Sequence, residues 1–286
     1  MKLHVVNHGN FKLDGGAMFG VVPKTIWNKL NPADENNMCT WAMRSLLIEE
    51  EDRLILIDAG MGNKQSDKFF SHYYLHGEDD FDKNLAAIGF TKNDITDVFL
   101  THLHFDHCGG AIMKEGDSLV PAFKNAVYWS NALQWKWATE PNPREKASFL
   151  PENILPIQQS GQLQFINTVR SENGQLGEVD FLSGFTVRFA YGHTEAMMLP
   201  QIKYNGKTIV YMADLLPSYA HIPLPYVMGY DTRPLLTMSE KEVFLKEALE
   251  NNYILFFEHD AKHECCTLRQ TEKGIRPHDF FTLNNV

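Results

Sequence analysis

The residues of this chain that could do chemistry are histidines and aspartates gathered in a short segment. The segment THLHFDHCGG, at 101–110, holds four side chains that can bind a metal: His102, His104, Asp106 and His107. Side chains two residues apart on an extended segment share a face, so the first two histidines can hold one ion together. The Gly109-Gly110 pair that follows lets the backbone bend sharply beside them.

Three further side chains of metal-binding type stand at the ends of apolar segments: His193 in YGHT, Asp214 in YMAD and His259 in FFEHD. In α/β proteins, functional groups gather where strands end at one edge of a sheet. Five imidazoles and two carboxylates suit zinc, manganese, iron or cobalt. Seven ligands are too many for one tetrahedral ion, but they divide between two ions if one carboxylate bridges. Such a pair of ions holds a hydroxide, because it lowers the pKa of water to about 7.

The elements that must position these residues are strands mixed with a few helices. We expect a short opening strand within 1–10 and further strands at 41–49, 53–58, 95–102, 126–129, 163–166, 185–191, 197–204, 207–214 and 252–260. The polar residues 49–52 favour a hairpin between the strands on either side. We expect helices at 81–89, at 130–138 with Ser130 as N-cap, and at 239–251 with Ser239 as N-cap. Asn205-Gly206 between two apolar runs predicts a second hairpin. No composition break divides the chain, so we predict a single domain over 1–286.

Two long segments lack a regular pattern and are expected to form loops. One covers 11–40, and the other covers 217–237 as a lid or pocket wall. We predict that Met18, Phe19, Trp27, Phe105 and Tyr219 line an apolar substrate pocket, with ordinary loop packing as the alternative. His221 and Tyr226 are candidates for polarising a carbonyl or protonating a leaving group.

Composition limits the partners. The charge is 26 − 36 = −10, which argues against nucleic acid and against an anionic membrane surface. The sequence has no apolar run of 18 residues, and its N-terminus has no apolar signal segment. The four cysteines are too few for a disulfide framework. We therefore expect a cytoplasmic protein that acts on a small molecule.

The segment HLHFDH resembles the HxHxDH signature of the metallo-β-lactamase superfamily. His193, Asp214 and His259 follow in the order of that family, and the resemblance covers about 41–260. It implies an α/β fold, the αββα four-layer sandwich, with two mixed sheets and helices on the outer faces. It also implies two divalent metal ions. His102, His104 and His193 would hold the first ion, Asp106, His107 and His259 would hold the second, and Asp214 would bridge them.

Other residues have supporting roles in this interpretation. The resemblance implies that Asp58, in LIDAG, orients a ligand histidine. Thr101 and Thr194 flank ligands and can hydrogen-bond to ligating groups, and Asp106 can help to shuttle a proton. Within the superfamily the chain looks most like N-acyl homoserine lactonases and organophosphate hydrolases, which suggests a homodimer. It departs from the lactonases at Pro217, where they carry a tyrosine, and at GHTEAM (192–197), where GHTPGH is usual.

The leading hypothesis is a dinuclear metal-dependent hydrolase of a small apolar ester-like substrate, possibly a lactone. The alternatives are a phosphotriesterase or aryl esterase of the same fold, and a metal-containing ligand sensor without activity. An RNA-processing nuclease is disfavoured by the negative charge. A glyoxalase-II-type thioesterase is disfavoured because only 27 residues follow His259, too few for its helical domain.

Overall fold

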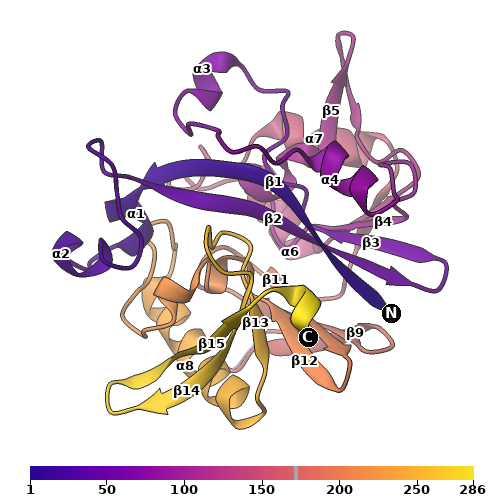
Figure 1. The fold of residues 1–286 in the computed structure, drawn as a ribbon. Helices are drawn as coiled ribbons and strands as arrows, with labels where there is room; N and C mark the ends of the chain where they lie inside the picture. The colour runs from indigo at the N-terminus through magenta and orange to yellow at the C-terminus, as the bar shows by residue number, and fades with distance from the viewer. Residues whose placement is uncertain (171–172) are drawn as a thin grey trace. The chain divides into compact units, whose positions relative to one another are not determined.

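The computed structural model describes residues 1–170 and 173–286, and in it the chain forms two compact units (Figure 1). Unit 1 comprises residues 1–10 and 43–167, and unit 2 comprises residues 11–42 and 168–286. The chain passes from one unit to the other within strands β1 (Lys2–Asp14) and β2 (Met38–Glu50) and again after residue 167. The prediction of a single domain is not tested by this division and stays a prediction.

Unit 1 is built on a six-stranded mixed sheet with the order β1-β2-β3-β4-β7-β8. The further strands are β3 (Arg53–Ile57), β4 (Asp97–Phe99), β7 (Val127–Ser130) and β8 (Leu163–Phe165). Strands β2 and β3 pair as the predicted antiparallel hairpin, and β3, β4, β7 and β8 are parallel. Because parallel strands end at a common edge, the residues after β3 and β4 emerge side by side. A separate hairpin pairs β5 (Ile112–Glu115) with β6 (Ser118–Pro121).

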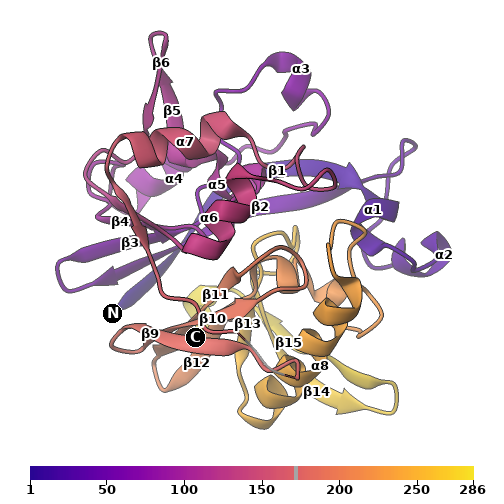
Figure 2. The ribbon, with the colours of Figure 1, turned by 180° about the vertical axis from the view of Figure 1, so that it is seen from behind.

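The helices of unit 1 are short, and they gather around the sheet in Figure 2. They are α3 (Asp67–Phe70), α4 (Phe81–Ala87), α5 (Phe105–Cys108), the 3₁₀ turn η1 (Gly109–Ala111), α6 (Ala132–Thr139) and α7 (Pro151–Gln159). Leu85, Trp135 and Ile154 bring α4, α6 and α7 into one apolar cluster with the sheet. Burial of this cluster supplies the main stabilisation of the unit.

Unit 2 is built on a seven-stranded mixed sheet with the order β15-β14-β13-β12-β11-β10-β9. The strands are β9 (Gly177–Leu182), β10 (Phe185–Ala190), β11 (Met197–Tyr204), β12 (Lys207–Tyr211), β13 (Ile254–Phe256), β14 (Cys265–Thr271) and β15 (Gly274–Phe281). Strands β12 and β13 are parallel, with Val210 opposite Leu255. The predicted Asn205-Gly206 hairpin is confirmed: both residues have positive φ, as a type I′ turn requires.

The helices of unit 2 are α1 (Gly15–Phe19), α2 (Lys24–Trp27), α8 (Pro234–Glu250) and the 3₁₀ turns η2 (Ala213–Leu215), η3 (Tyr219–His221) and η4 (Leu283–Asn285). Helix α8 is tied to the sheet by an ion pair in which Arg188 of β10 donates twice to the Glu247 carboxylate. It also packs against the turn that carries His193. A Cβ on Gly192 would lie 2.3 Å from the Thr237 hydroxyl and 2.4 Å from its nitrogen, so only glycine fits there.

Several expected boundaries are wrong. The segment 11–40 is not one loop: β1 extends to Asp14, α1 and α2 lie inside the segment, and β2 begins at Met38. Helix α6 is capped by the side chain of Asn131, which accepts from the Gln134 amide, and not by Ser130. The strands expected at 95–102 and 252–260 shorten to β4 and β13.

The last predicted helix begins five residues earlier than expected. Pro234 starts α8, since its fixed φ suits the first helical position and it lacks an amide hydrogen that would need a partner. Ser239 is therefore inside the helix and not its N-cap, and the segment 217–237 is irregular only up to Arg233, apart from η3. Strands β5, β6, β9, β14 and β15 and helix α7 were not predicted. In the described part of the chain, no helix is long and apolar enough to cross a membrane.

Candidate metal centre

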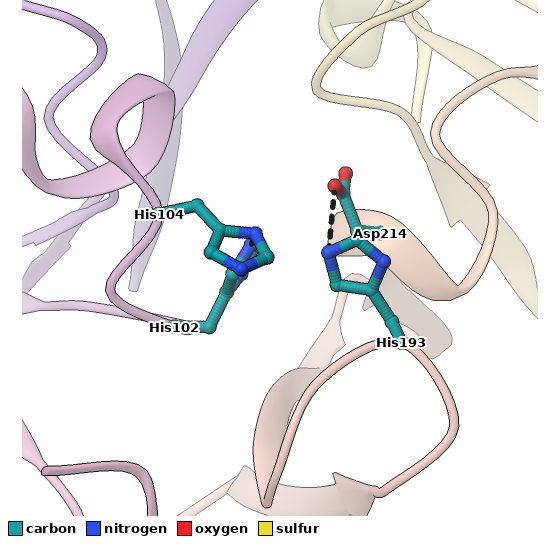
Figure 3. Close-up of side chains that lie close together, drawn as sticks. All are labelled: His102, His104, His193 and Asp214. Atoms are coloured by element: carbon teal, nitrogen blue, oxygen red, sulfur yellow. Dashed lines mark hydrogen bonds and ion pairs between the residues drawn. The ribbon is translucent and has the colours of Figure 1, made fainter. Parts of the chain in front are cut away.

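The loop after β4 presents two candidate ligand histidines side by side. His102 and His104 are buried, and the Nε2 atom of His102 lies 3.0 Å from the Nδ1 atom of His104 (Figure 3). Two nitrogens that bind one tetrahedral zinc ion at its usual bond length are about 3.3 Å apart. The pair is therefore placed as two ligands of one ion require, which agrees with the shared face expected from the sequence.

Helix α5 supplies a second pair of candidate ligands from the same loop. The Nε2 atom of His107 lies 3.9 Å from an Asp106 oxygen, and both residues are buried. Gly109 and Gly110 follow at once. Added Cβ atoms there would lie 2.2 Å from the Met61 oxygen and 2.0 Å from the Ala59 oxygen. The glycines are needed for this close approach of two backbones, so the loop is held rigidly against the end of β3.

Asp58, at the end of β3, holds this loop from behind. Its carboxylate is fully buried and accepts from the Thr101 amide at 2.8 Å and the Thr101 hydroxyl at 2.7 Å. One of its oxygens also lies 3.1 Å from the Nδ1 atom of His107. A carboxylate at Nδ1 keeps the proton there and leaves Nε2 unprotonated for a metal. This is the contact that the predicted role of Asp58 requires.

Glu145 has a similar position on His104 and was missed in the sequence. One carboxylate oxygen lies 3.3 Å from the Nε2 atom of His104, and the other accepts from Trp137 and Asn142, each at 2.6 Å. The Nδ1 atom of His104 is thereby left facing His102. Glu145 follows α6 in an irregular stretch 41 residues from its histidine, with no local pattern that announces the contact.

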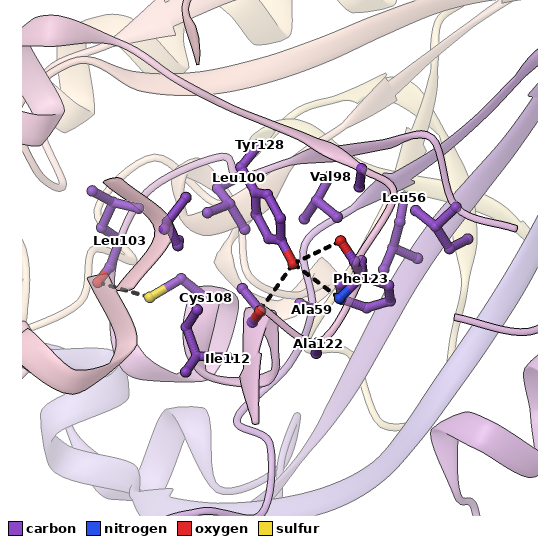
Figure 4. Close-up of a cluster of buried hydrophobic side chains, with 14 of the residues drawn as sticks. Leu56, Ala59, Val98, Leu100, Leu103, Cys108, Ile112, Ala122, Phe123 and Tyr128 are labelled. Carbon is purple, nitrogen blue, oxygen red and sulfur yellow. Dashed lines mark hydrogen bonds between the residues drawn. The ribbon is translucent and has the colours of Figure 1, made fainter. Parts of the chain in front are cut away.

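The ligand loop rests on the apolar core of unit 1. Leu103 and Cys108 lie among buried side chains in the cluster of Figure 4. The Cys108 thiol donates to the Leu103 carbonyl, and burial raises its pKa to about 12, so it stays a thiol. The Tyr128 hydroxyl in the same cluster donates to the Ala111 carbonyl at 3.1 Å and accepts from the Phe123 amide at 3.0 Å.

In unit 2, one carboxylate stands between two imidazoles. An oxygen of Asp214 lies 3.2 Å from the Nε2 atom of His193 (Figure 3), and its other oxygen lies 3.4 Å from the Nε2 atom of His259. These distances are close to the spacing of two atoms on one tetrahedral ion. Each oxygen of Asp214 therefore faces its own histidine.

The outer nitrogens of these two histidines are also occupied. The Nδ1 atom of His193 lies 2.8 Å from an Asp231 oxygen, and that of His259 lies 2.8 Å from the Ala42 carbonyl. Both contacts place the ring proton on Nδ1 and direct the lone pair of Nε2 toward Asp214. Asp231 belongs to the segment that was expected to form a lid, and nothing in the sequence marked it as a partner of His193.

Glu240 of α8 fixes the turn before His193. Its buried carboxylate accepts from the amides of Tyr191 at 2.7 Å and Gly192 at 3.0 Å. Burial raises the pKa of Glu240 to about 7, although these two hydrogen bonds act in the opposite direction. The backbone next to Asp214 is also constrained, because Ala213 has a φ of +40°, a left-handed value that is uncommon outside glycine.

The predicted catalytic residue His221 is a packing residue in this structure. Its ring stacks on Phe19 with centroids 4.8 Å apart, its Nε2 atom donates to the Met18 carbonyl at 2.9 Å, and its Nδ1 atom accepts from the Ser218 hydroxyl at 2.9 Å. Burial lowers the pKa of His221 to about 3, so the ring is neutral. Both ring nitrogens are engaged within the protein, so neither is placed to exchange a proton with a substrate.

The expected pocket residues of unit 2 are mostly buried. Met18, Phe19 and Trp27 are at most 2% exposed, so they are core residues of the N-terminal segment. The Tyr219 hydroxyl donates to the Leu30 carbonyl at 3.1 Å. Tyr226, the other candidate for polarising a carbonyl, is half-buried with its ring edge toward Phe19. Thr194, which was expected to hydrogen-bond to a ligating group, is fully buried and directly follows His193 in the chain.

Phe105 lies in an aromatic cluster of unit 1. Its ring centroid is 5.3 Å from that of Phe69 and 4.8 Å from that of Tyr73. Burial, together with the nearby charge of Asp106, raises the pKa of Tyr73 to about 12, so its hydroxyl stays protonated. The residue before Asp106 in the chain is therefore part of an apolar aromatic cluster.

Comparison with known proteins agrees with this geometry. The family model of the metallo-beta-lactamase superfamily matches residues 44–259, a range that includes all seven candidate ligands. The chain belongs to this superfamily. As a metallo-beta-lactamase superfamily member it is a metal-dependent hydrolase, and the predicted fold class is confirmed.

Individual relatives are more distant. An N-acyl homoserine lactonase of Bacillus cereus is 23% identical, over 92% of this chain and 94% of the relative. The structure of a probable metal-dependent hydrolase from Staphylococcus aureus is 29% identical, with a TM-score of 0.86 over 98% of this chain and 96% of that one. The structure of AidC, a dizinc quorum-quenching lactonase with a bound product, is 21% identical, with a TM-score of 0.77 over 98% and 95% of the two chains.

The residues of this superfamily member fit divalent metal ions. The donor set is five imidazoles and two carboxylates, all of them buried. His104, His107, His193 and His259 each have a carboxylate or carbonyl at one ring nitrogen and another ligand-type atom at the second or near it. Such outer contacts are what ligand histidines need.

Proposed function

We propose that the protein binds two divalent ions and uses them to hydrolyse a small apolar ester-like substrate, with a lactone as the preferred class. The proposal of two ions rests on Asp214, because its two oxygens face two different imidazoles, those of His193 and His259. The proposed first ion is held by His102, His104 and His193, and the second by Asp106, His107 and His259, with Asp214 shared. Zinc is the proposed metal, and manganese, iron or cobalt would suit the same ligands.

The chemistry divides between the ions and the chain. When bound, the two ions supply Lewis acidity, which lowers the pKa of water and polarises a carbonyl. The chain supplies rigid placement: Asp58, Glu145 and Asp231 hold ring nitrogens so that the opposite nitrogens face the ions. Asp106, beside His107, is the proposed acceptor of the proton that the attacking water loses.

The lactone preference rests on the relatives and on the aromatic cluster. Relatives described as N-acyl homoserine lactonases match over most of the chain, and Phe69, Tyr73 and Phe105 provide an apolar surface for an acyl chain. Pro217 stands where the lactonases carry a tyrosine. Tyr219 does not replace that tyrosine, because its hydroxyl is committed to the Leu30 carbonyl. We also propose that the protein is cytoplasmic and forms a homodimer.

The test is acid release from a substrate panel by the metal-reconstituted protein. The panel holds short- and long-chain acyl homoserine lactones, γ- and δ-lactones, aryl esters, a phosphotriester and a glutathione thioester. We expect kcat/KM on at least one lactone to reach about 10⁴ M⁻¹s⁻¹ or more. Asp214→Asn is expected to abolish this activity, while Asp279→Asn, at an exposed carboxylate, leaves it unchanged. A higher kcat/KM on the phosphotriester or an aryl ester would make that class the preferred substrate in place of a lactone. The absence of acid release from every substrate of the panel would contradict the proposed activity.

A further inference from the structure

Unit 2 contains a cavity of about 330 Å³ that includes none of the proposed metal ligands. Helix α8, the segment 222–225 and the β14–β15 hairpin form its walls. Its volume is at the lower end of the range of small-molecule sites. All of the residues that line it belong to unit 2, so the cavity is complete within that unit.

The floor of the cavity is apolar. Ile222 and Leu245 are buried at 0% and 3% exposure, and Leu224, Pro225 and Ile275 complete the lining. Water molecules in such a hollow make few hydrogen bonds with its walls. An apolar group that displaces them is stabilised by its own removal from bulk water. The floor therefore favours a hydrocarbon chain.

The rim of the cavity is basic, in a protein whose net charge is −10. Lys246, Lys273 and Arg276 line it, and Glu242 is the acidic residue among the lining residues. The Lys246 ammonium pairs with Glu242 at 2.7 Å, but both side chains are at least half exposed, so the pair is weak and its ammonium can turn to a ligand. Arg276 uses one of its five donors on the Ile275 carbonyl. The rim therefore complements an anion.

The segment that forms part of the floor is firmly held. The buried Lys241 ammonium donates to the carbonyls of Pro223 and Leu224, each at 3.3 Å, and of Tyr226 at 2.7 Å. These three hydrogen bonds hold the backbone of 223–226 in place. The hollow is thus preformed, so a ligand does not have to order it.

We propose that this cavity binds an amphiphilic carboxylate, with an unbranched acyl chain on the Ile222–Leu245 floor and the carboxylate at the Lys273–Arg276 rim. Free fatty acids and ring-opened N-acyl homoserines share this chemistry. The binding does not depend on the hydrolase activity proposed above, so the two proposals can fail separately.

The experiment is calorimetric titration of the full chain, both metal-loaded and after chelation. The ligands are hexanoate, octanoate and decanoate, with N-decanoyl homoserine as the second source. We expect binding in both metal states, with affinity rising by up to about fourfold per added methylene, which is about 0.8 kcal/mol each. Binding of decanoate without binding of N-decanoyl homoserine would identify a fatty-acid site. Stronger binding of N-decanoyl homoserine than of decanoate would identify a site for that product class.

Variants locate the site. Lys273→Glu with Arg276→Glu is expected to weaken decanoate binding at least tenfold, while Lys207→Glu, at an exposed lysine of β12, leaves it unchanged. Ile275→Ser, on the hairpin, should reduce the dependence on chain length. Binding that needs the metal, equal binding of decyltrimethylammonium, or no effect of the double charge reversal would each overturn the proposal.

Discussion

At the scale of residues, the site depends on what holds the outer nitrogen of each histidine. Asp58, Glu145, Asp231 and the Ala42 carbonyl each contact a ring nitrogen of a different proposed ligand. A ring fixed in this way needs no reorientation when it binds an ion. The four contacts should therefore contribute to metal affinity although none of these groups is itself a proposed ligand.

Two substitutions test this role. Glu145→Gln and Asp231→Asn each remove the negative charge at a ligand histidine, and we expect zinc affinity to fall about 10- to 100-fold. Competition with a chromophoric chelator measures the change, and Glu272→Gln, at an exposed carboxylate, serves as the control. Unchanged zinc affinity in both variants would show that the contacts are only structural.

A second prediction separates packing from catalysis at His221. His221→Ala removes a buried ring and two hydrogen bonds, so we expect a loss of about 3 kcal/mol in the free energy of unfolding. Because both ring nitrogens are already engaged, kcat of the folded variant should stay within about threefold. A drop of about 10² or more in kcat, the size typical of general acid–base residues, would restore His221 to the catalytic machinery. His221→Gln, which keeps a donor for Met18, should recover part of the stability.

At the scale of elements, α8 organises unit 2 around the ligands. Glu240 holds the amides of Tyr191 and Gly192, and Lys241 holds the carbonyls of 223, 224 and 226. Adjacent residues of one helix thus fix the turn before His193 and the segment that follows η3. The helix acts as a support for two loops that have no regular structure of their own.

Glu240 gives this support a pH dependence. Its pKa is about 7 in the folded protein against an ordinary value of 4.5, mainly because of burial. The folded state then holds a proton that the unfolded state has lost, so this contribution to stability is complete below pH 4.5 and is lost as pH rises through 7. Two and a half pKa units correspond to about 3 kcal/mol.

The measurement is urea unfolding of the chelated protein and of Glu240→Gln at pH 5 and pH 7.5. The wild-type protein should lose more stability between these two values than the variant does, because the substituted glutamine side chain cannot titrate. Other groups titrate in both proteins and cancel in the comparison. Parallel profiles would mean that Glu240 is not protonated in the folded state at pH 5.

The sequence points to candidate ligands more readily than to the elements around them. The seven proposed ligands could be picked out because their spacing and their positions after apolar runs are local signals. The helix α8 and the β14–β15 hairpin were misplaced or missed. In α8 the proline start precedes the amphipathic pattern, and β15 carries Pro277 and charged residues that hide the strand alternation. Glu145 and Asp231 could not be found, because contacts over 41 and 38 residues are made only by the folded chain.

At the scale of the whole molecule, ligand-type residues occur in both compact units. Unit 1 contributes four of the proposed ligands and unit 2 contributes three, and the superfamily match spans both. Metal binding is therefore expected to have a role in stability as well as in chemistry.

Metal removal tests that role. A ligand at about 100 times its Kd stabilises the state that binds it by about 2.7 kcal/mol, so chelation should lower the Tm clearly. Calorimetry of the loaded and the chelated protein measures this difference in Tm. The same Tm in both states would argue against metal binding by the folded protein.

The central claim is a dinuclear centre that hydrolyses a lactone, and one titration addresses it directly. Zinc is added stepwise to the chelated protein, and the initial rate of acyl homoserine lactone hydrolysis is measured at each step. The account predicts that the rate rises until two equivalents of zinc per chain are present and then stays constant. A rate that saturates at one equivalent, or the absence of lactone hydrolysis at every zinc concentration, would contradict it.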